Sequence, residues 1–156
     1  MRKKTVEPRI VSKRFTLVGA ESKIDFGSDF GPVLGALYRQ VTDRLDEMRG
    51  LAQPVRMIGY WHSAPGGDVY YFAGVEAQAA PEGLTVKALP ESLYAVFDEQ
   101  RRGEMGGPEG AGYKWLGASK EYTYNEAIPG DFEVYANLTD TAPDCPAEIY
   151  IPIKKN

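Results

Sequence analysis

The spacing of apolar residues predicts a strand and then an amphipathic helix in the first third of the chain. Residues 8–20 alternate between two faces, as in a half-buried strand in which Lys13 is the one exception. Its apolar face carries Val11, Phe15 and Leu17. Between Pro32 and Gly50, apolar residues recur every three or four positions. This spacing is typical of an amphipathic helix, in which proline is tolerated in the first turn and glycine ends the last.

The remaining pattern repeats this order. Strands are expected at 55–61 and 68–77, joined into a hairpin by a turn rich in proline and glycine. The second half then offers a strand, a short helix and two strands over residues 84–97, 113–116, 131–138 and 147–154. We therefore predict an α+β fold in a single domain over residues 1–156. In it, two pseudo-symmetric β-α-β-β units, about 8–78 and 82–154, share an antiparallel sheet.

Two segments fall outside the repeat. Residues 1–7 are basic and are expected to fray as a solvated terminus. The segment 101–112 contains five glycines and precedes the short helix, so we expect a surface loop there. Such a loop is compatible with a lid over a pocket and equally with an ordinary connection.

Composition and charge narrow the class of protein. The chain is 43% hydrophobic and 26% charged, and its 156 residues are enough for one core without cross-links. Cys145 is the only cysteine, and no apolar signal segment follows Met1, so a cytoplasmic location is expected. No apolar run is long enough to span a membrane. Residues 15–156 carry 12 basic and 21 acidic side chains, which disfavours direct binding to DNA and favours cations.

The residue inventory excludes several kinds of active site. His62 is the only histidine, so neither a zinc site with two histidines nor any other metal or cofactor site is expected. The motifs of serine hydrolases, dinucleotide-binding proteins and P-loop proteins are missing. A Cys145–His62 pair is disfavoured because the neighbouring Asp144 would raise the pKa of the thiol.

Carboxylates among aromatic residues remain as candidate chemistry. In the predicted strand 131–138, Asp131, Glu133 and Tyr135 share one face, and the opposite, apolar face is expected to meet the helices. The next strand presents Glu148 and Tyr150 on its own polar face. An acid among aromatic rings suits an organic cation, although a solvent-facing side of the sheet would show the same alternation.

Five segments in order resemble a known family: residues 8–11, 68–75, 86–97, 132–135 and 147–154. They are similar to the gyrase-inhibitor-like effector-binding domain of AraC-type and MerR-type multidrug regulators, which also occurs as a standalone protein. The resemblance implies two β-α-β-β units about a pseudo-twofold axis, with a ligand groove between them. It also implies that Glu133 faces this groove.

The same resemblance implies further wall residues of the groove. Tyr71 and Tyr150 are carried over by their positions in the hairpin and the last strand, and Tyr60, Trp61 and Trp115 are added as aromatic candidates for which core packing is an equal alternative. Because the chain has no room for a helix-turn-helix reader, the resemblance implies no direct contact with DNA.

The leading hypothesis is a small-molecule-binding domain for amphipathic, cationic compounds, with Glu133 as the counter-charge. One alternative is a hydrolase of reactive cyclic molecules that uses the same carboxylate on water. Another is a protein-interaction module similar to gyrase inhibitors, with a protein partner bound at the basic start of the chain. A second polar group within hydrogen-bond distance of Glu133, such as Tyr135 or Tyr150, would favour the hydrolase.

Overall fold

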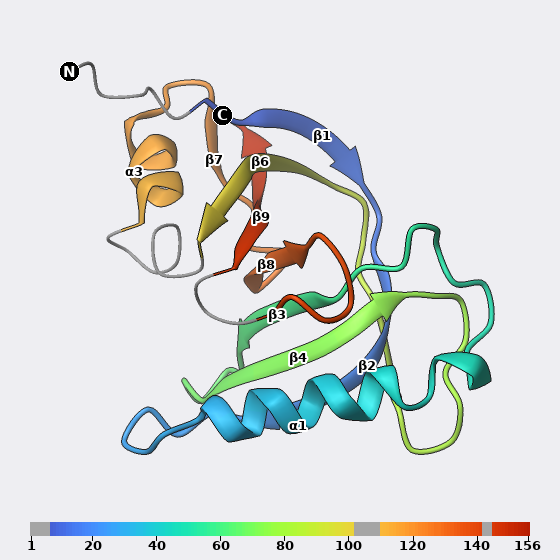
Figure 1. The fold of residues 1–156 in the computed structure, drawn as a ribbon. Coiled ribbons are helices and arrows are strands. Elements are labelled where there is room, and N and C mark those ends of the chain that lie inside the picture. Colours follow the sequence, from blue (N-terminus) through green and yellow to red (C-terminus); the bar gives the residue numbers. More distant parts are fainter. Residues whose placement is uncertain (1–6, 102–109, 142–144) are drawn as a thin grey trace.

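One antiparallel sheet organises the computed structural model, which describes residues 7–101, 110–141 and 145–156 (Figure 1). Within these residues the strands are β1 Arg9–Lys13, β2 Thr16–Lys23, β3 Ile58–Ser63, β4 Val69–Glu76, β5 Thr85–Ala88, β6 Ser92–Arg101, β7 Tyr122–Tyr124, β8 Gly130–Tyr135 and β9 Pro146–Lys155. The helices are α1 Gly31–Thr42, the short 3-10 helix η1 Leu45–Glu47, and α3 Ala111–Ala118. This confirms the predicted α+β class.

The order of the strands reflects the two repeated units. Across the sheet it is β1-β6-β9-β8-β3-β4-β2-β5, with β7 paired to β9. The unit β2-α1-β3-β4 thus contributes neighbours β3-β4-β2, and the unit β6-α3-β8-β9 contributes β8-β9-β6 in the mirrored order. The two units meet at the β3–β8 ladder, which lies at the centre of the sheet. The predicted β-α-β-β arrangement is confirmed.

The strand expected over residues 8–20 is broken in two. The chain leaves the ladder at Arg14 and Phe15, because β1 pairs with β6 whereas β2 pairs with β4 and β5. The same chain therefore lines two distant parts of the strand order, and the sheet curls back on itself (Figure 1). The predicted apolar face is still correct, since Phe15 and Leu17 are buried inside the curl with Val11 packed against them.

Two other expectations need correction. The helix predicted as far as Gly50 ends at Thr42, and η1 follows, although Leu45 and Met48 still pack against the core beneath α1. The strand β7 was not predicted, because three residues are too few to show an alternating pattern. Residues 1–6, and most of the glycine-rich segment 101–112, lie outside the described residues, so the lid and the basic start remain predictions.

Both faces of the sheet are buried, and this reverses one expectation. The inner, concave face of the curl forms a core of Phe15, Leu17, Ile58, Tyr60, Phe72, Tyr94, Val96, Ile128, Phe132 and Val134. On the outer face α1 packs over β2 and β4, and α3 packs over β6 and β9. The expectation that Phe132 and Val134 meet the helices is therefore wrong. They fill the inner core, and Glu133 and Tyr135 lie on the helix side.

Candidate functional site

The central β3–β8 ladder brings the candidate residues of both units together. Residues that pair across neighbouring strands point to the same face of a sheet. Gly59 pairs with Glu133 and Trp61 pairs with Asp131 between β3 and β8, and Trp61 also pairs with Tyr71 of β4. All of these residues therefore occupy the outer face.

Glu133 is a buried carboxylate with two aromatic hydrogen-bond donors. Glu133 is only 3% exposed to solvent. The indole Nε1–H of Trp61 donates to Oε1 over 2.5 Å, and the hydroxyl of Tyr135 donates to Oε2 over 2.6 Å. A buried carboxylate is costly unless hydrogen bonds satisfy its oxygens, so these donors hold the negative charge in place.

Asp131 is a second carboxylate on the same face, two residues earlier on β8. It is half-buried, and the hydroxyl of Tyr113 in α3 donates a hydrogen bond to its Oδ2. Burial raises the pKa of Asp131 to about 6, a rise that the Tyr113 hydrogen bond opposes and the nearby Glu133 reinforces. The site thus contains two acids whose charges interact.

Tyrosine and tryptophan rings from the first unit complete the cluster. Tyr71 is fully buried, and its hydroxyl lies 2.7 Å from that of Tyr38 in α1. Its ring meets Trp61 edge to face, with 4.7 Å between ring centroids. A glycine is required at position 59, because a Cβ there would lie 2.0 Å from the Tyr71 hydroxyl oxygen. Burial, with the negative charge of Glu133 in second place, raises the pKa of Tyr71 well above its ordinary value.

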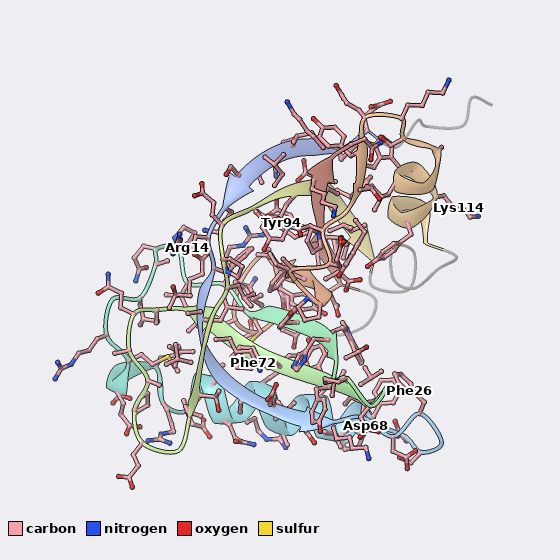
Figure 2. All side chains as sticks on the ribbon, turned by 180° about the vertical axis from the view of Figure 1, so that it is seen from behind. Arg14, Phe26, Asp68, Phe72, Tyr94 and Lys114 are labelled. Atoms are coloured by element: carbon pink, nitrogen blue, oxygen red, sulfur yellow. The ribbon has the colours of Figure 1, made fainter. Side chains whose placement is uncertain are left out.

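Two phenylalanines of the loop before α1 extend the cluster to the surface. Phe26 stacks on Trp61 at 6.3 Å between ring centroids, and Phe30 meets Trp61 edge to face at 6.0 Å. Phe26 is 62% exposed, one of the three large hydrophobic residues exposed in the described chain. Figure 2 shows Phe26 at an edge of the molecule, near Asp68. We call the group of Asp131, Glu133, Trp61, Tyr71, Tyr135, Tyr38, Tyr113, Phe26 and Phe30 the aromatic–carboxylate cluster.

The structure brings together only some of the residues expected from the sequence. Glu133, Trp61 and Tyr71 are in direct or nearest-neighbour contact. Tyr60 and Tyr150 instead pair with Phe132 across the ladders, so they lie on the inner face, opposite to Glu133.

Trp115 lies apart as well. It packs in α3 against Phe97 and Tyr122. For Tyr60 and Trp115 these positions correspond to the alternative of core packing, whereas Tyr150 was expected beside Glu133 and lies on the other face of the sheet.

Sequence reasoning missed several members of the cluster. Asp131 was recognised as sharing the face of Glu133, yet it was not chosen as a site residue. Tyr38 follows Leu37 on the helix stripe, and its hydroxyl could only be assigned to Tyr71 once the packing of α1 was known. Phe26 gives no periodic signal, because it lies in a loop.

Of the cavities lined by described residues, two lie away from this cluster. The larger, of about 770 Å³, is lined by Arg56, Asp98, Val134, Ala136, Asp140, Cys145, Pro146, Ala147 and Glu148. Charged side chains in its lining form ion pairs. One carboxylate oxygen of Glu148 lies 2.6 Å from the guanidinium of Arg56, and the other lies 2.7 Å from that of Arg9. The smaller, of about 140 Å³, shares Arg56 and Val134 with it and also touches Tyr150. The lining of neither cavity includes Glu133 or Asp131.

Other chemistry is sparse among the described residues. Within them no group of three or more histidine, cysteine, aspartate or glutamate side chains could hold a metal ion. His62 lies 2.7 Å from a carboxylate oxygen of Glu21 and between the rings of Tyr60 and Tyr70. Neither α1 nor α3, the α-helices of the described chain, has the length and apolar character that a membrane crossing needs. Among the described residues, the aromatic–carboxylate cluster is the arrangement in which negative charge is bounded by several aromatic rings.

Comparisons with known proteins agree with the fold. The transcriptional regulator BrlR of Pseudomonas aeruginosa is 30% identical over 157 residues, covering 96% of this chain and 56% of the regulator. The chain thus spans about half the length of this curated relative. The solved structure of SAV2435 bound to tetraphenylphosphonium has a TM-score of 0.64 at 17% identity, covering 95% of this chain and 94% of the other.

A second solved structure shows the same fold. It is a putative bacterial transcription regulation protein from Staphylococcus aureus MU50, with a TM-score of 0.61, 16% identity, and coverage of 96% of this chain and 99% of the other. The family model described as Cass2, integron-associated effector binding protein, matches residues 12–153, which is nearly the whole described fold. This chain therefore belongs to the family of integron-associated effector binding proteins.

Proposed function

We propose that the chain binds amphipathic organic cations at the aromatic–carboxylate cluster. The observation that carries this proposal is Glu133: a carboxylate only 3% exposed, held by Trp61 and Tyr135, among further aromatic rings. Such a site supplies a fixed negative charge, ring surfaces for cation–π contact and apolar area at the same place.

Two findings outside the cluster support this proposal. The family model is described as one of effector binding proteins. A protein with the same fold has been solved with tetraphenylphosphonium, a lipophilic cation, bound to it. The position of the cluster where the two units meet also agrees with a groove between the halves.

The direct test compares a cation with a neutral molecule of similar shape. A ligand that binds only the folded state raises the unfolding temperature, by an amount that corresponds to about 2.7 kcal/mol at one hundred times its Kd. We expect tetraphenylphosphonium to raise the melting temperature and to bind in titration calorimetry. Triphenylphosphine oxide, which has similar rings without net charge, is expected to bind much more weakly.

Two glutamate variants separate the counter-charge from general electrostatics. Glu133→Gln keeps the size of the side chain and is expected to remove most of the selectivity for the cation. Glu47→Gln is the control, because Glu47 is exposed and paired with Arg44 in η1, outside the cluster. Equal loss of cation and neutral binding in Glu133→Gln would contradict the role of its charge.

One observation also favours the hydrolase as a second candidate. The Tyr135 hydroxyl lies 2.6 Å from Glu133 Oε2, so a second polar group is within hydrogen-bond reach of the carboxylate. In a hydrolase Glu133 would accept a proton from the attacking water. Turnover of an epoxide or a lactone that is lost in Glu133→Gln would establish this function. If neither the wild type nor the variant hydrolyses them faster than the uncatalysed reaction, the function is excluded for those substrates.

A further inference from the structure

Asp131 adds a second negative charge to the cluster, and like Glu133 it belongs to the second unit. Asp131 and Glu133 are two residues apart on β8 and face the same way. A strand rises about 3.3 Å per residue, so the two residues are about 7 Å apart along it. Each carboxylate has its own phenolic donor, Tyr113 from α3 for Asp131 and Tyr135 for Glu133.

No basic side chain among the described residues forms an ion pair with Asp131. The ion pairs found in this part of the chain involve other acids, such as Glu21, Glu76 and Glu148. Within the described part of the chain, the Asp131 carboxylate accepts its hydrogen bond from a neutral hydroxyl, that of Tyr113. Among the described residues, the negative charge of Asp131 is therefore not offset by a basic side chain.

The Trp61 side chain connects the two carboxylates. Its backbone is in register with Asp131, while its indole nitrogen reaches Glu133. Phe26 stacks on the same indole from the surface. The Trp61 indole thus lies beside the strand that carries both acids, and a flat ligand whose two charges are about 7 Å apart would bring one positive charge to each acid.

We propose that the cluster prefers dicationic aromatic ligands, with one positive charge placed at Glu133 and the other at Asp131. This inference rests on the proposed function and makes Asp131 the residue that determines the charge preference. A ligand with one positive charge placed at Glu133 would leave Asp131 without an opposite charge, whereas a dication also brings one to Asp131.

The test uses two flat cations of nearly the same shape. Methyl viologen carries a positive ring nitrogen at each end of two linked rings, and N-methyl-phenylpyridinium carries only one. The measured quantity is the ratio of their affinities, determined by calorimetry at pH 7.5. Small dications are strongly hydrated, and this affects the ratio in every variant alike. The readout is therefore the change of the ratio between wild type and variant.

We expect Asp131→Asn to lower the preference for methyl viologen about tenfold, since it removes one charge–charge attraction and leaves the shape unchanged. Glu133→Gln is expected to weaken both ligands. Glu47→Gln, the surface control, should leave the ratio unchanged. Circular dichroism and the melting temperature show that each variant is folded.

The outcomes distinguish this inference from the function on which it rests. If tetraphenylphosphonium binds and requires Glu133, but the ratio is the same in wild type and Asp131→Asn, the role of Asp131 is refuted and the cation site stands. If no cation binds the folded wild-type protein, the proposed function and this inference both fail. A ratio that falls equally in Glu47→Gln would attribute the preference to overall charge and would also refute it.

Discussion

The indole nitrogen of Trp61 donates a 2.5 Å hydrogen bond to Glu133, and each residue comes from a different β-α-β-β unit. The bond crosses the β3–β8 ladder, at which the two units meet, so it links the two units directly. A donor from one half of the chain thereby holds a buried carboxylate of the other half.

Replacing Trp61 by phenylalanine should separate the hydrogen bond from the ring. The variant keeps an aromatic surface but leaves Glu133 with one donor fewer, which should lower the free energy of unfolding by about 1–3 kcal/mol. Cation affinity should also fall several-fold, because the carboxylate is no longer fixed. Urea unfolding and calorimetry measure the two effects.

Trp115→Phe is the matched control for that variant, since Trp115 packs on Phe97 and Tyr122 in α3, away from Glu133. It is expected to leave cation affinity unchanged. If Trp115→Phe weakens cations as much as Trp61→Phe does, the hydrogen bond is not the cause.

The stability of the protein should depend on pH through Asp131. The folded state raises the pKa of Asp131 from 3.8 to about 6, so the folded protein holds its proton more strongly than the unfolded chain does. The resulting stabilisation is present below about pH 4 and is lost as the pH rises to about 6. Relative to Asp131→Asn, the wild-type protein should lose about 1–3 kcal/mol between pH 4 and pH 7.

Urea unfolding of both proteins across this pH range provides the measurement. Taking the difference between wild type and Asp131→Asn removes the contributions of other acids, such as Glu21, whose pKa is lowered by its hydrogen bonds to His62 and Lys87 against the effect of burial. Parallel curves for the two proteins would show that Asp131 titrates normally.

Gly59 should not tolerate a side chain. An alanine Cβ would lie 2.0 Å from the Tyr71 hydroxyl, which is fully buried and hydrogen-bonded to Tyr38. Gly59→Ala is therefore expected to lower stability by about 1–3 kcal/mol, through displacement of Tyr71, and to weaken cation binding.

Gly66 in the β3–β4 turn offers the comparison for that substitution, because a Cβ there meets no other atom within 4 Å. Thermal melts of Gly59→Ala and Gly66→Ala are the measurement. A similar, small change in both would mean that Tyr71 moves aside easily.

Phe26 should contribute to binding and little to stability. Its ring is 62% exposed yet stacks on Trp61, so Phe26→Ala removes ring surface at the rim and almost no core. We expect stability within about 0.5 kcal/mol of wild type and a several-fold loss of affinity for aromatic cations. Val86→Ala, at another exposed apolar residue, is the control and should leave affinity unchanged.

Sequence patterns predicted the order of most elements and the shared face of Glu133 and Tyr135, but they assigned incorrectly which face of the sheet meets the helices. Alternation in 131–136 correctly separated Phe132 from Glu133, because the period of a strand is local. Which face meets the helices depends on the curl of the sheet, and that curl arises from pairings of β1 with β6 and of β2 with β4. Such long-range pairings leave no mark on the local pattern.

The same limit explains the placement of the aromatic residues. Trp61 and Tyr71 were expected at the site and lie beside Glu133, whereas Tyr60 and Tyr150 are one residue out of phase and lie in the inner core. A shift of one residue along a strand exchanges the faces. The amphipathic ring of tyrosine suits either environment, so its identity alone does not distinguish them.

The inner core contains rings of Tyr60, Phe132 and Phe15 stacked in series, at 4.4 Å and 4.6 Å between centroids. Along β8, the residues of this stack alternate with those of the cluster, so neighbouring codons serve separate tasks. Under the proposed function, substitutions at positions 131 and 133 would change ligand preference, while Phe132 continues to fill the inner core.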